Sequence, residues 1–183
     1  MKKKLVLFAL LLSATCVYAQ KHKIWVGAEL GYGVTLSDKG DLYDMSYADH
    51  KDMRIGMLKL LVGYYVTPDL SLGVGAGSSN YNPGTLNILP VFLDVRYHPF
   101  KNKRILLNGD IGCAFLTPAA YKKGKLLMDF SVGYKVLDKK VSIIPAIGYN
   151  YCGYDAGISV SDNIPLKDSQ NKHSLFVKVG VIF

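Results

Sequence analysis

Large apolar residues alternate with small or polar residues along most of this chain. From Leu89 to His98 one parity is apolar throughout, whereas the other carries Asp94 and Arg96. A period of two predicts β-strands, because successive side chains of a strand point to opposite faces. The segments expected to be strands are Ile24–Thr35, Met53–Val66, Leu70–Ser79, Ile88–His98, Arg104–Leu116, Lys125–Leu137, Val141–Cys152 and His173–Phe183.

These eight segments have about the length of tilted strands that cross a membrane, roughly 9–11 residues. Short and longer connections alternate between them. The short ones are expected at Thr67–Asp69, Pro99–Lys103 and Asp138–Lys140, and the longer ones at Leu36–Asp52, Asn80–Asn87, Thr117–Gly124 and Gly153–Lys172. This organisation predicts an all-β protein, an eight-stranded antiparallel up-and-down transmembrane β-barrel with short periplasmic turns and longer external loops. Pro90 and Pro145 are expected to mark bulges or strand ends.

The alternation has two interpretations, which differ in the face that points outward. A secreted, soluble, lipocalin-like carrier would keep its apolar face inside. However, an eight-stranded barrel has room inside for few bulky side chains, whereas the glycine-rich face would fit there. Aromatic residues of the apolar face also fall near the two ends of the strands, as in the interfacial girdles of a membrane barrel. These residues are Tyr64, Tyr97, Tyr134 and Phe183 at one end and Tyr32, Phe115, Tyr149 and Tyr151 at the other.

The membrane interpretation places charged residues of both signs inside the barrel. They are Glu29, Asp94, Asp110 and Asp129, with Lys59, Arg96, Lys135 and Lys178. Buried charges persist when they are paired and hydrogen-bonded. We therefore expect an internal salt-bridge network that includes Glu29, Lys59 and Lys178.

The N-terminal residues have the composition of a secretory signal peptide. Three lysines precede the apolar run Leu5–Leu12, and a small residue, Ala19, follows at the expected cleavage site. The predicted domains are thus a signal peptide at 1–19 and a barrel at 20–183. Removal of the three lysines lowers the formal charge from +8 to +5. Without a dense basic patch, this charge argues against nucleic-acid binding. Cys113 and Cys152 are expected to remain unpaired on opposite faces of non-adjacent strands.

The chain ends in the sequence "HSLFVKVGVIF", which alternates up to its last residue, Phe183. At this point the sequence resembles the small eight-stranded outer-membrane barrels of the OmpX/Ail and OmpA-transmembrane-domain type. The resemblance implies that strand eight closes against strand one, in the outer membrane of a Gram-negative bacterium. It also implies contact with outer-membrane lipid and lipopolysaccharide, and an assembly signal that the insertion machinery reads. The residues matching that signal are Leu175, Val177, Val179, Val181 and Phe183.

The expected function is structural, or a surface interaction through the external loops. The resemblance implies adhesion, binding of a host factor or envelope stability, with a protein or host ligand at the loops. No catalytic, cofactor or metal-binding residues are assigned, although the first long loop holds five aspartates and stays open as a cation site. One alternative is a lipid A-modifying enzyme that uses His173 and Ser174; the other is the soluble small-ligand carrier.

Overall fold

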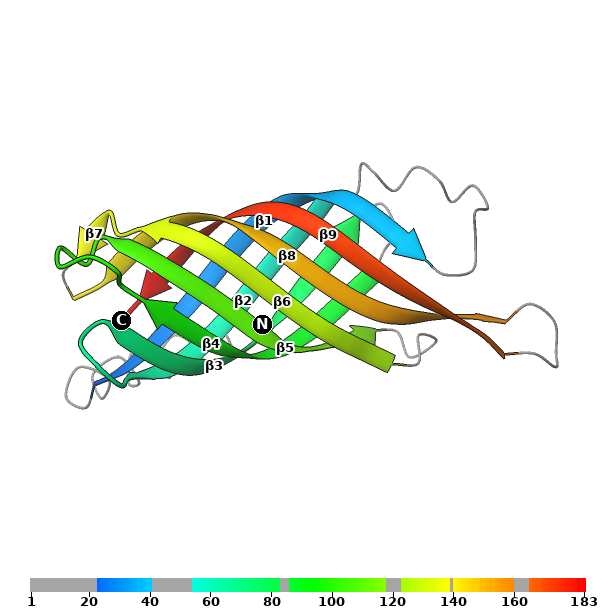
Figure 1. The fold of residues 1–183 in the computed structure, drawn as a ribbon, viewed down its shortest axis with the longest axis horizontal. Helices are drawn as coiled ribbons and strands as arrows, with labels where there is room; N and C mark the ends of the chain where they lie inside the picture. The colour runs from blue at the N-terminus through cyan, green and yellow to red at the C-terminus, as the bar shows by residue number, and fades with distance from the viewer. Residues whose placement is uncertain (1–22, 41–53, 83–85, 118–122, 139, 160–164) are drawn as a thin grey trace, which may run out of the picture.

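The computed structural model describes residues 23–40, 54–82, 86–117, 123–138, 140–159 and 165–183. The predicted signal peptide and most of the first loop lie outside these residues. Within them, the chain forms a single antiparallel β-barrel (Figure 1). The strands are β1 (Ile24–Gly40), β2 (Arg54–Tyr65), β3 (Leu70–Asn82), β4 (Leu86–Tyr97), β5 (Ile105–Thr117), β6 (Lys123–Tyr134), β7 (Leu137–Asp138), β8 (Ser142–Ser159) and β9 (Pro165–Ile182).

The barrel closes at both of the places where an open sheet would have edges. β1 pairs with β2 on one side and with the C-terminal β9 on the other. β6 pairs with β8, and the two-residue β7 adds to β8 in the connection between them. The eight long strands therefore form the closed up-and-down barrel that the sequence predicts. Among the described residues there is no helix long and apolar enough to cross a membrane.

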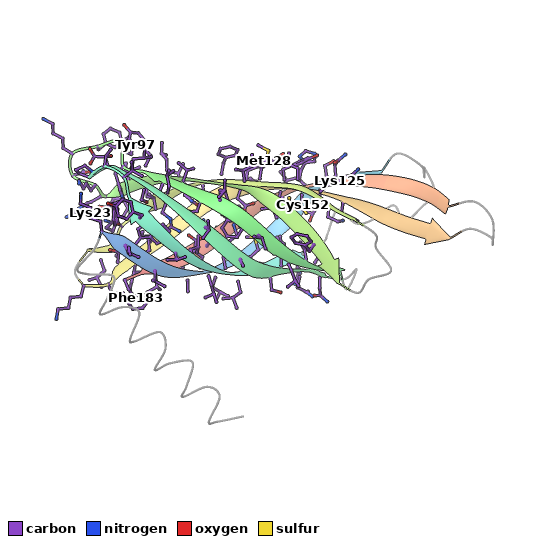
Figure 2. The ribbon with its side chains drawn as sticks, turned by 90° about the horizontal axis from the view of Figure 1, so that it is seen from below. Lys23, Tyr97, Lys125, Met128, Cys152 and Phe183 are labelled. Atoms are coloured by element: carbon purple, nitrogen blue, oxygen red, sulfur yellow. The ribbon has the colours of Figure 1, made fainter. Side chains whose placement is uncertain are left out.

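Large apolar side chains cover the outside of the barrel (Figure 2), whereas charged side chains of the strands and two apolar clusters are buried in the lumen. Leu30 is 67 % exposed, Ile147 62 % and Leu93 58 %, although all three lie in the middle of their strands. Soluble monomers rarely expose apolar patches of more than a few hundred Å². The apolar face is therefore outside, the opposite of what a soluble carrier barrel requires.

The two ends of the barrel differ, and we name them by their connections. At the turn end, short connections join β2 to β3, β4 to β5 and β6 to β8. At the other end, called the hairpin end, β8 and β9 project beyond the remaining strands (Figure 1). The prediction of a long loop at Gly153–Lys172 is wrong, since β8 continues to Ser159 and β9 begins at Pro165. The N–H and C=O groups of β8 and β9 bond to each other there, so the two strands can continue without an alternation of apolar residues.

The two prolines inside strands do not mark bulges. Pro90 pairs with Ala114 in an unbroken β4–β5 register, and no register shift accompanies it. On the β3 side the pairing is interrupted between the pairs Ala76–Val91 and Ser79–Ile88, without a change of register. Pro145 lies beyond Ala146, where the pairing of β8 with β6 ends. The missing N–H of proline thus falls where the ladder is already interrupted.

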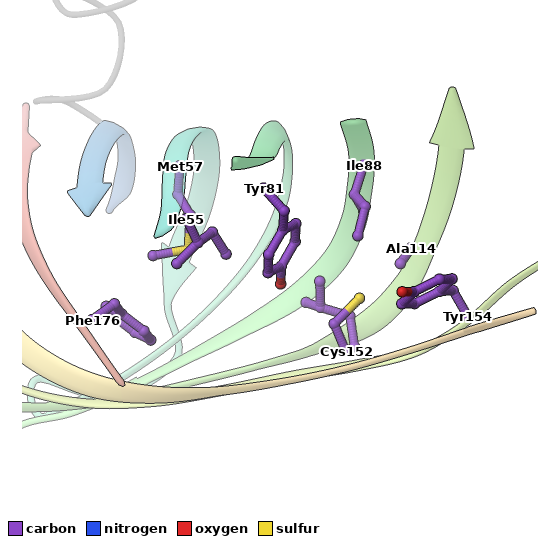
Figure 3. Packing of buried hydrophobic residues seen from close by; sticks show 9 residues of the cluster. Ile55, Met57, Tyr81, Ile88, Ala114, Cys152, Tyr154 and Phe176 are labelled. Carbon is purple, nitrogen blue, oxygen red and sulfur yellow. The ribbon is translucent and has the colours of Figure 1, made fainter. Parts of the chain in front are cut away.

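Side chains fill the lumen in three layers, which can be read along β2. Ile55 and Met57 belong to an apolar cluster toward the hairpin end, Lys59 is charged, and Leu61 belongs to a second apolar cluster toward the turn end. Figure 3 shows the first cluster, with Tyr81, Cys152 and Phe176 directed into the interior. Glycine makes room for these groups: a Cβ on Gly63 would collide with the Trp25 ring. The lumen glycines therefore reflect lack of space.

Candidate functional site

The middle layer of the lumen is a network of buried ion pairs, which we call the charge belt. Arg96 donates to Glu29 Oε1 and to Asp94 Oδ1, at 2.8 Å in each case. Lys178 Nζ donates to the other oxygen of Glu29 at 2.7 Å. The structure therefore brings Glu29 and Lys178 together across the seam between β1 and β9.

Lys59 forms the second half of the charge belt. Its Nζ lies 2.6 Å from Asp110 Oδ2 and also contacts Asp129. Asp110 and Asp129 are direct partners across β5 and β6, so two carboxylates face each other in one rung of the sheet. A single ammonium group between them neutralises part of their repulsion.

Amide side chains complete the charge belt, which has four carboxylates and three cations among the residues named above. Asn108 donates to Asp94 at 2.6 Å and to Asp110 at 3.2 Å, and its oxygen accepts from Lys178 at 2.6 Å. Asn150 donates to Asp129 and accepts from the Tyr81 hydroxyl at 3.0 Å. The amide donors thus offset the surplus of acceptors, as buried polar groups require.

Trp25 is a lumen residue to which the sequence analysis assigned no role. Its side chain is 2 % exposed, and the Arg96 guanidinium lies 4.3 Å from its ring centre. The interaction is a cation–π contact in a site closed to water. The alternation along the strand could have placed Trp25 in the lumen, because Trp25 lies on the same face of β1 as Glu29. Asn108, Ser131 and Asn150 could have been found in the same way.

Of the eight charged residues predicted for the lumen, the ion pairs above join seven. The structure places the eighth, Lys135, in the lining of a pocket at the turn end. The predicted girdle residues all lie on the outward face. They are Tyr64, Tyr97, Tyr134 and Phe183 toward the turn end, with Tyr32, Phe115, Tyr149 and Tyr151 toward the hairpin end. Of the predicted assembly signal, Leu175, Val177 and Val179 are exposed on the outside of β9, where Val181 and Phe183 are half-buried.

A small polar cluster lies on the outer face near the hairpin end. The Tyr149 hydroxyl is hydrogen-bonded to His173 Nδ1, and the Tyr151 ring packs edge-on against the same imidazole at 5.2 Å. The Tyr151 hydroxyl donates to Asn171 at 2.7 Å. These groups come from the neighbouring strands β8 and β9.

The pairing of His173 with Ser174, suggested as an enzyme alternative, is not present. Ser174 is fully buried in the lumen beside Thr35, with their hydroxyls 3.3 Å apart, whereas His173 is on the outer face. Consecutive residues of a strand cannot share a face. The direct partner of His173 on β1 is instead Ser37, which follows a register shift after Thr35. Across-strand partners share a face, so Ser37 and His173 lie side by side.

Metal ligands and thiols are the remaining candidates for a functional site. No group of three or more His, Cys, Asp or Glu side chains within them is placed to hold a metal ion. Cys113 is exposed and Cys152 is buried, and both are free thiols, as the sequence predicts. The aspartates of the first loop beyond Gly40 lie outside the described residues.

Comparison with known proteins gives a likeness of fold without a likeness of sequence. No family model and no curated protein sequence matches the chain. The outer membrane enzyme PagL superposes with a TM-score of 0.50 at 14 % identity, over 83 % of this chain and 97 % of that one. Ail of Yersinia pestis, in complex with the heparin analogue sucrose octasulfate, gives 0.49 at 11 % identity, over 88 % and 99 %. OprG from Pseudomonas aeruginosa gives 0.47 at 12 %, over 89 % and 97 %. The chain therefore has the fold of the small eight-stranded outer-membrane β-barrels, as its resemblance to them predicted.

Proposed function

We propose that this protein is an integral outer-membrane barrel with a filled lumen, which acts as a rigid support for a surface interaction at its hairpin end. The observation that carries the proposal is the separation of its two faces. The side chains of the charge belt are sealed in the lumen, and an apolar face bounded by aromatic residues is outside. Only a bilayer offers an apolar surrounding to a closed barrel of this kind.

The three layers of the lumen support a role other than conduction of solutes. The charge belt lies between two apolar clusters, and buried side chains of all three layers come from strands around the barrel. Water-filled channels are found in barrels of about sixteen strands, whereas eight strands leave an interior that side chains fill.

The hairpin end supports the interaction role. β8 and β9 stay paired from Tyr154–Gln170 to Ser159–Pro165, and β1 follows β9 as far as Gly40. With the turns in the periplasm, this extended sheet stands on the external side of the membrane. A rigid sheet loses little conformational entropy when a partner binds, which favours its use as a contact surface.

Trimming the hairpin tests the proposal. Removing residues 156–168 and joining Asp155 to Ser169 through Asn-Gly keeps the paired backbone up to a tight turn. We expect the trimmed protein to stay in the outer-membrane fraction and to keep the gel shift on boiling that marks a closed barrel. Binding of expressing cells to host cells or extracellular matrix should be lost.

The control for this experiment alters the turn end. Lys101→Ala with Asn102→Ala changes exposed residues there and should leave binding unchanged. Binding that survives trimming would contradict the interaction role. Absence of wild-type protein from the outer-membrane fraction would contradict the location itself.

A second candidate function is an enzyme of the outer membrane, favoured by the position of Ser37 beside His173. Imidazole next to a hydroxyl is the arrangement that activates a serine nucleophile. Tyr149 and Tyr151 hold the His173 ring on the outer face, where the acyl chains of a lipid would lie. The fold is shared with an enzyme, PagL, although the identity is too low to transfer an activity.

Expression in a bacterial host and the mass spectrum of its lipid A test this candidate. If the protein modifies lipid A, the spectrum should change with the wild type and return to normal with Ser37→Ala or His173→Ala. Ser174→Ala is the matched control, since its hydroxyl is buried in the lumen, and it should keep the change. An unaltered spectrum with the wild-type protein would dismiss the candidate.

A further inference from the structure

A pocket of about 410 Å³ opens at the turn end of the barrel. This volume lies in the range of sites that bind small molecules, roughly 300–1,000 Å³. The pocket is separate from the charge belt and from the outer polar cluster. Its lining consists of Lys23, Tyr65, Val66, Thr67, Pro68, His98, Lys103 and Lys135.

The pocket is built by segments that are distant in the sequence. Lys23 precedes β1, and its carbonyl accepts from the N–H of Tyr65 at 2.9 Å. Lys103, in the β4–β5 turn, donates to the carbonyl of Pro68 in the β2–β3 turn at 2.7 Å. The N–H of His98 donates to the carbonyl of Asp69 at 2.8 Å. The segment before β1, the β2–β3 turn and the β4–β5 turn are thus held together around one opening.

The lining is strongly basic. It contains three lysines and a histidine, and no carboxylate is among the described residues that form it. Asp69, an acidic residue outside the lining, lies 3.3 Å from Lys103 Nζ in a pair that is partly exposed to water. Because the three lysines of the lining outnumber this one carboxylate, the site keeps a net positive charge.

The floor of the pocket is apolar. Tyr65 packs against the cluster formed by Trp25, Leu61, Phe92, Leu106, Ile144 and Ile182. A cleft lined by charges of one sign, with walls of low dielectric constant, concentrates the electric field within it. An anion in this pocket is therefore attracted more strongly than at an open lysine-rich surface.

Two backbone conformations in the lining have a cost in energy. Lys23 has a φ of 58° and Lys103 a φ of 52°, and they are the non-glycine residues with positive φ among those described. Such conformations are strained for residues other than glycine and gather at functional sites. Both of these lysines lie in the lining of this one pocket.

The geometry points to a phosphate-binding site at the turn end, formed by Lys23, Lys103, Lys135 and His98. A phosphate group offers several acceptor oxygens to ammonium groups that approach from different directions. Thr67 adds a hydroxyl, whose oxygen already accepts from the N–H of Leu70 at 3.0 Å and whose proton can therefore be donated. The phosphate belongs either to a soluble anion or to the headgroup of a phospholipid in the adjacent leaflet.

Titration of the mature protein in an uncharged detergent tests the site, with sodium phosphate as the probe and sodium chloride at constant ionic strength. Trp25 is the single tryptophan of the chain and belongs to the apolar cluster against which the lining residue Tyr65 packs, so its fluorescence is the signal for binding. We expect saturable binding by the wild type. Lys103→Gln with Lys135→Gln should weaken binding by roughly tenfold or more, since two charge-assisted contacts are lost.

The matched control is Lys101→Gln with Lys140→Gln, which removes the same charge from two exposed lysines at the same end. It should bind phosphate as the wild type does. Equal weakening by both double variants, or a wild type without saturable binding, would overturn the site. The gel shift on boiling verifies that each variant is folded.

A second probe distinguishes the sources of the phosphate. Dihexanoylphosphatidylglycerol binding more tightly than inorganic phosphate would identify a lipid headgroup, and the reverse order would identify a soluble anion. Either order of affinity supports the site, provided that Lys103→Gln with Lys135→Gln weakens the binding of both probes. If that variant bound the lipid and inorganic phosphate as tightly as the wild type does, the site would be overturned.

Discussion

Replacing Lys59 with alanine is expected to destabilise the barrel by about 3–5 kcal/mol, the range measured when one partner of a buried ion pair is removed. Lys59 is the ion-pair partner of both Asp110 and Asp129, whose side chains are almost wholly buried. Without the ammonium group these two carboxylates would face each other in one rung of the sheet. Unfolding in urea, followed by the gel shift on boiling, measures the change in free energy.

Two variants make the cause specific. Lys59→Met combined with Asp110→Asn and Asp129→Asn removes the charges on both sides, and we expect it to recover most of the lost stability. Lys101→Ala removes an exposed lysine at the turn end and should change the free energy of unfolding by less than about 0.5 kcal/mol. If Lys59→Ala unfolds at the wild-type urea concentration, the charge belt does not stabilise the fold.

An arginine in place of Leu93 is expected to cost about 2–4 kcal/mol when the protein is folded in phospholipid vesicles. Leu93 is 58 % exposed in the middle of β4, where its neighbours in the sheet are Val74 and Ile111. In the proposed bilayer this position is near the centre of the hydrocarbon layer, so a charge there must be moved out of water. The free energy of unfolding from vesicles measures the cost.

Phe100→Arg is the matched control for Leu93→Arg. Phe100 is 54 % exposed, but it lies in the β4–β5 turn, beyond the girdle residue Tyr97. The same substitution there should be close to neutral. A Leu93→Arg protein as stable as the wild type in vesicles would contradict a lipid-facing position, and with it the membrane assignment of the whole apolar face.

The closed lumen explains how a small barrel tolerates so many charges. Glu29, Lys59 and Asp129 would be unfavourable alone in a site excluded from water. Each has a partner of opposite charge, and Asn108 and Asn150 supply further donors to the carboxylates. Replacing one member therefore has a larger effect than its contribution to a single contact suggests.

The faces of the strands could be predicted from the sequence, because the period of two fixes which residues share a side. Leu93 and Asp94 are neighbours in the chain, and alternation alone assigns them to opposite faces. The choice between lumen and exterior also followed from local information. One face of each strand is rich in glycine, and glycine on a strand face indicates a crowded interior. Gly63 is an example, because a Cβ there would collide with the Trp25 ring.

The extent of the strands was less predictable. The residues after Gly153 have no apolar alternation, and a loop was expected there, yet β8 continues to Ser159. The backbone pairing of this hairpin, from Tyr154–Gln170 to Ser159–Pro165, does not require an apolar pattern in the sequence. The partner of His173 was also hidden, since the register shift between Thr35 and Ser37 has no sequence signal.

The sequence by itself determined the number of membrane-length strands, the side of each residue and seven of the eight charges that it assigned to the lumen. Which charges pair was decided only by the tertiary structure. Lys59 meets Asp110 and Asp129, 51 and 70 residues away, because the strands tilt and their register is staggered around the barrel. Alternation is a local property of the backbone, whereas the residues that face one another across a lumen depend on how the whole sheet closes.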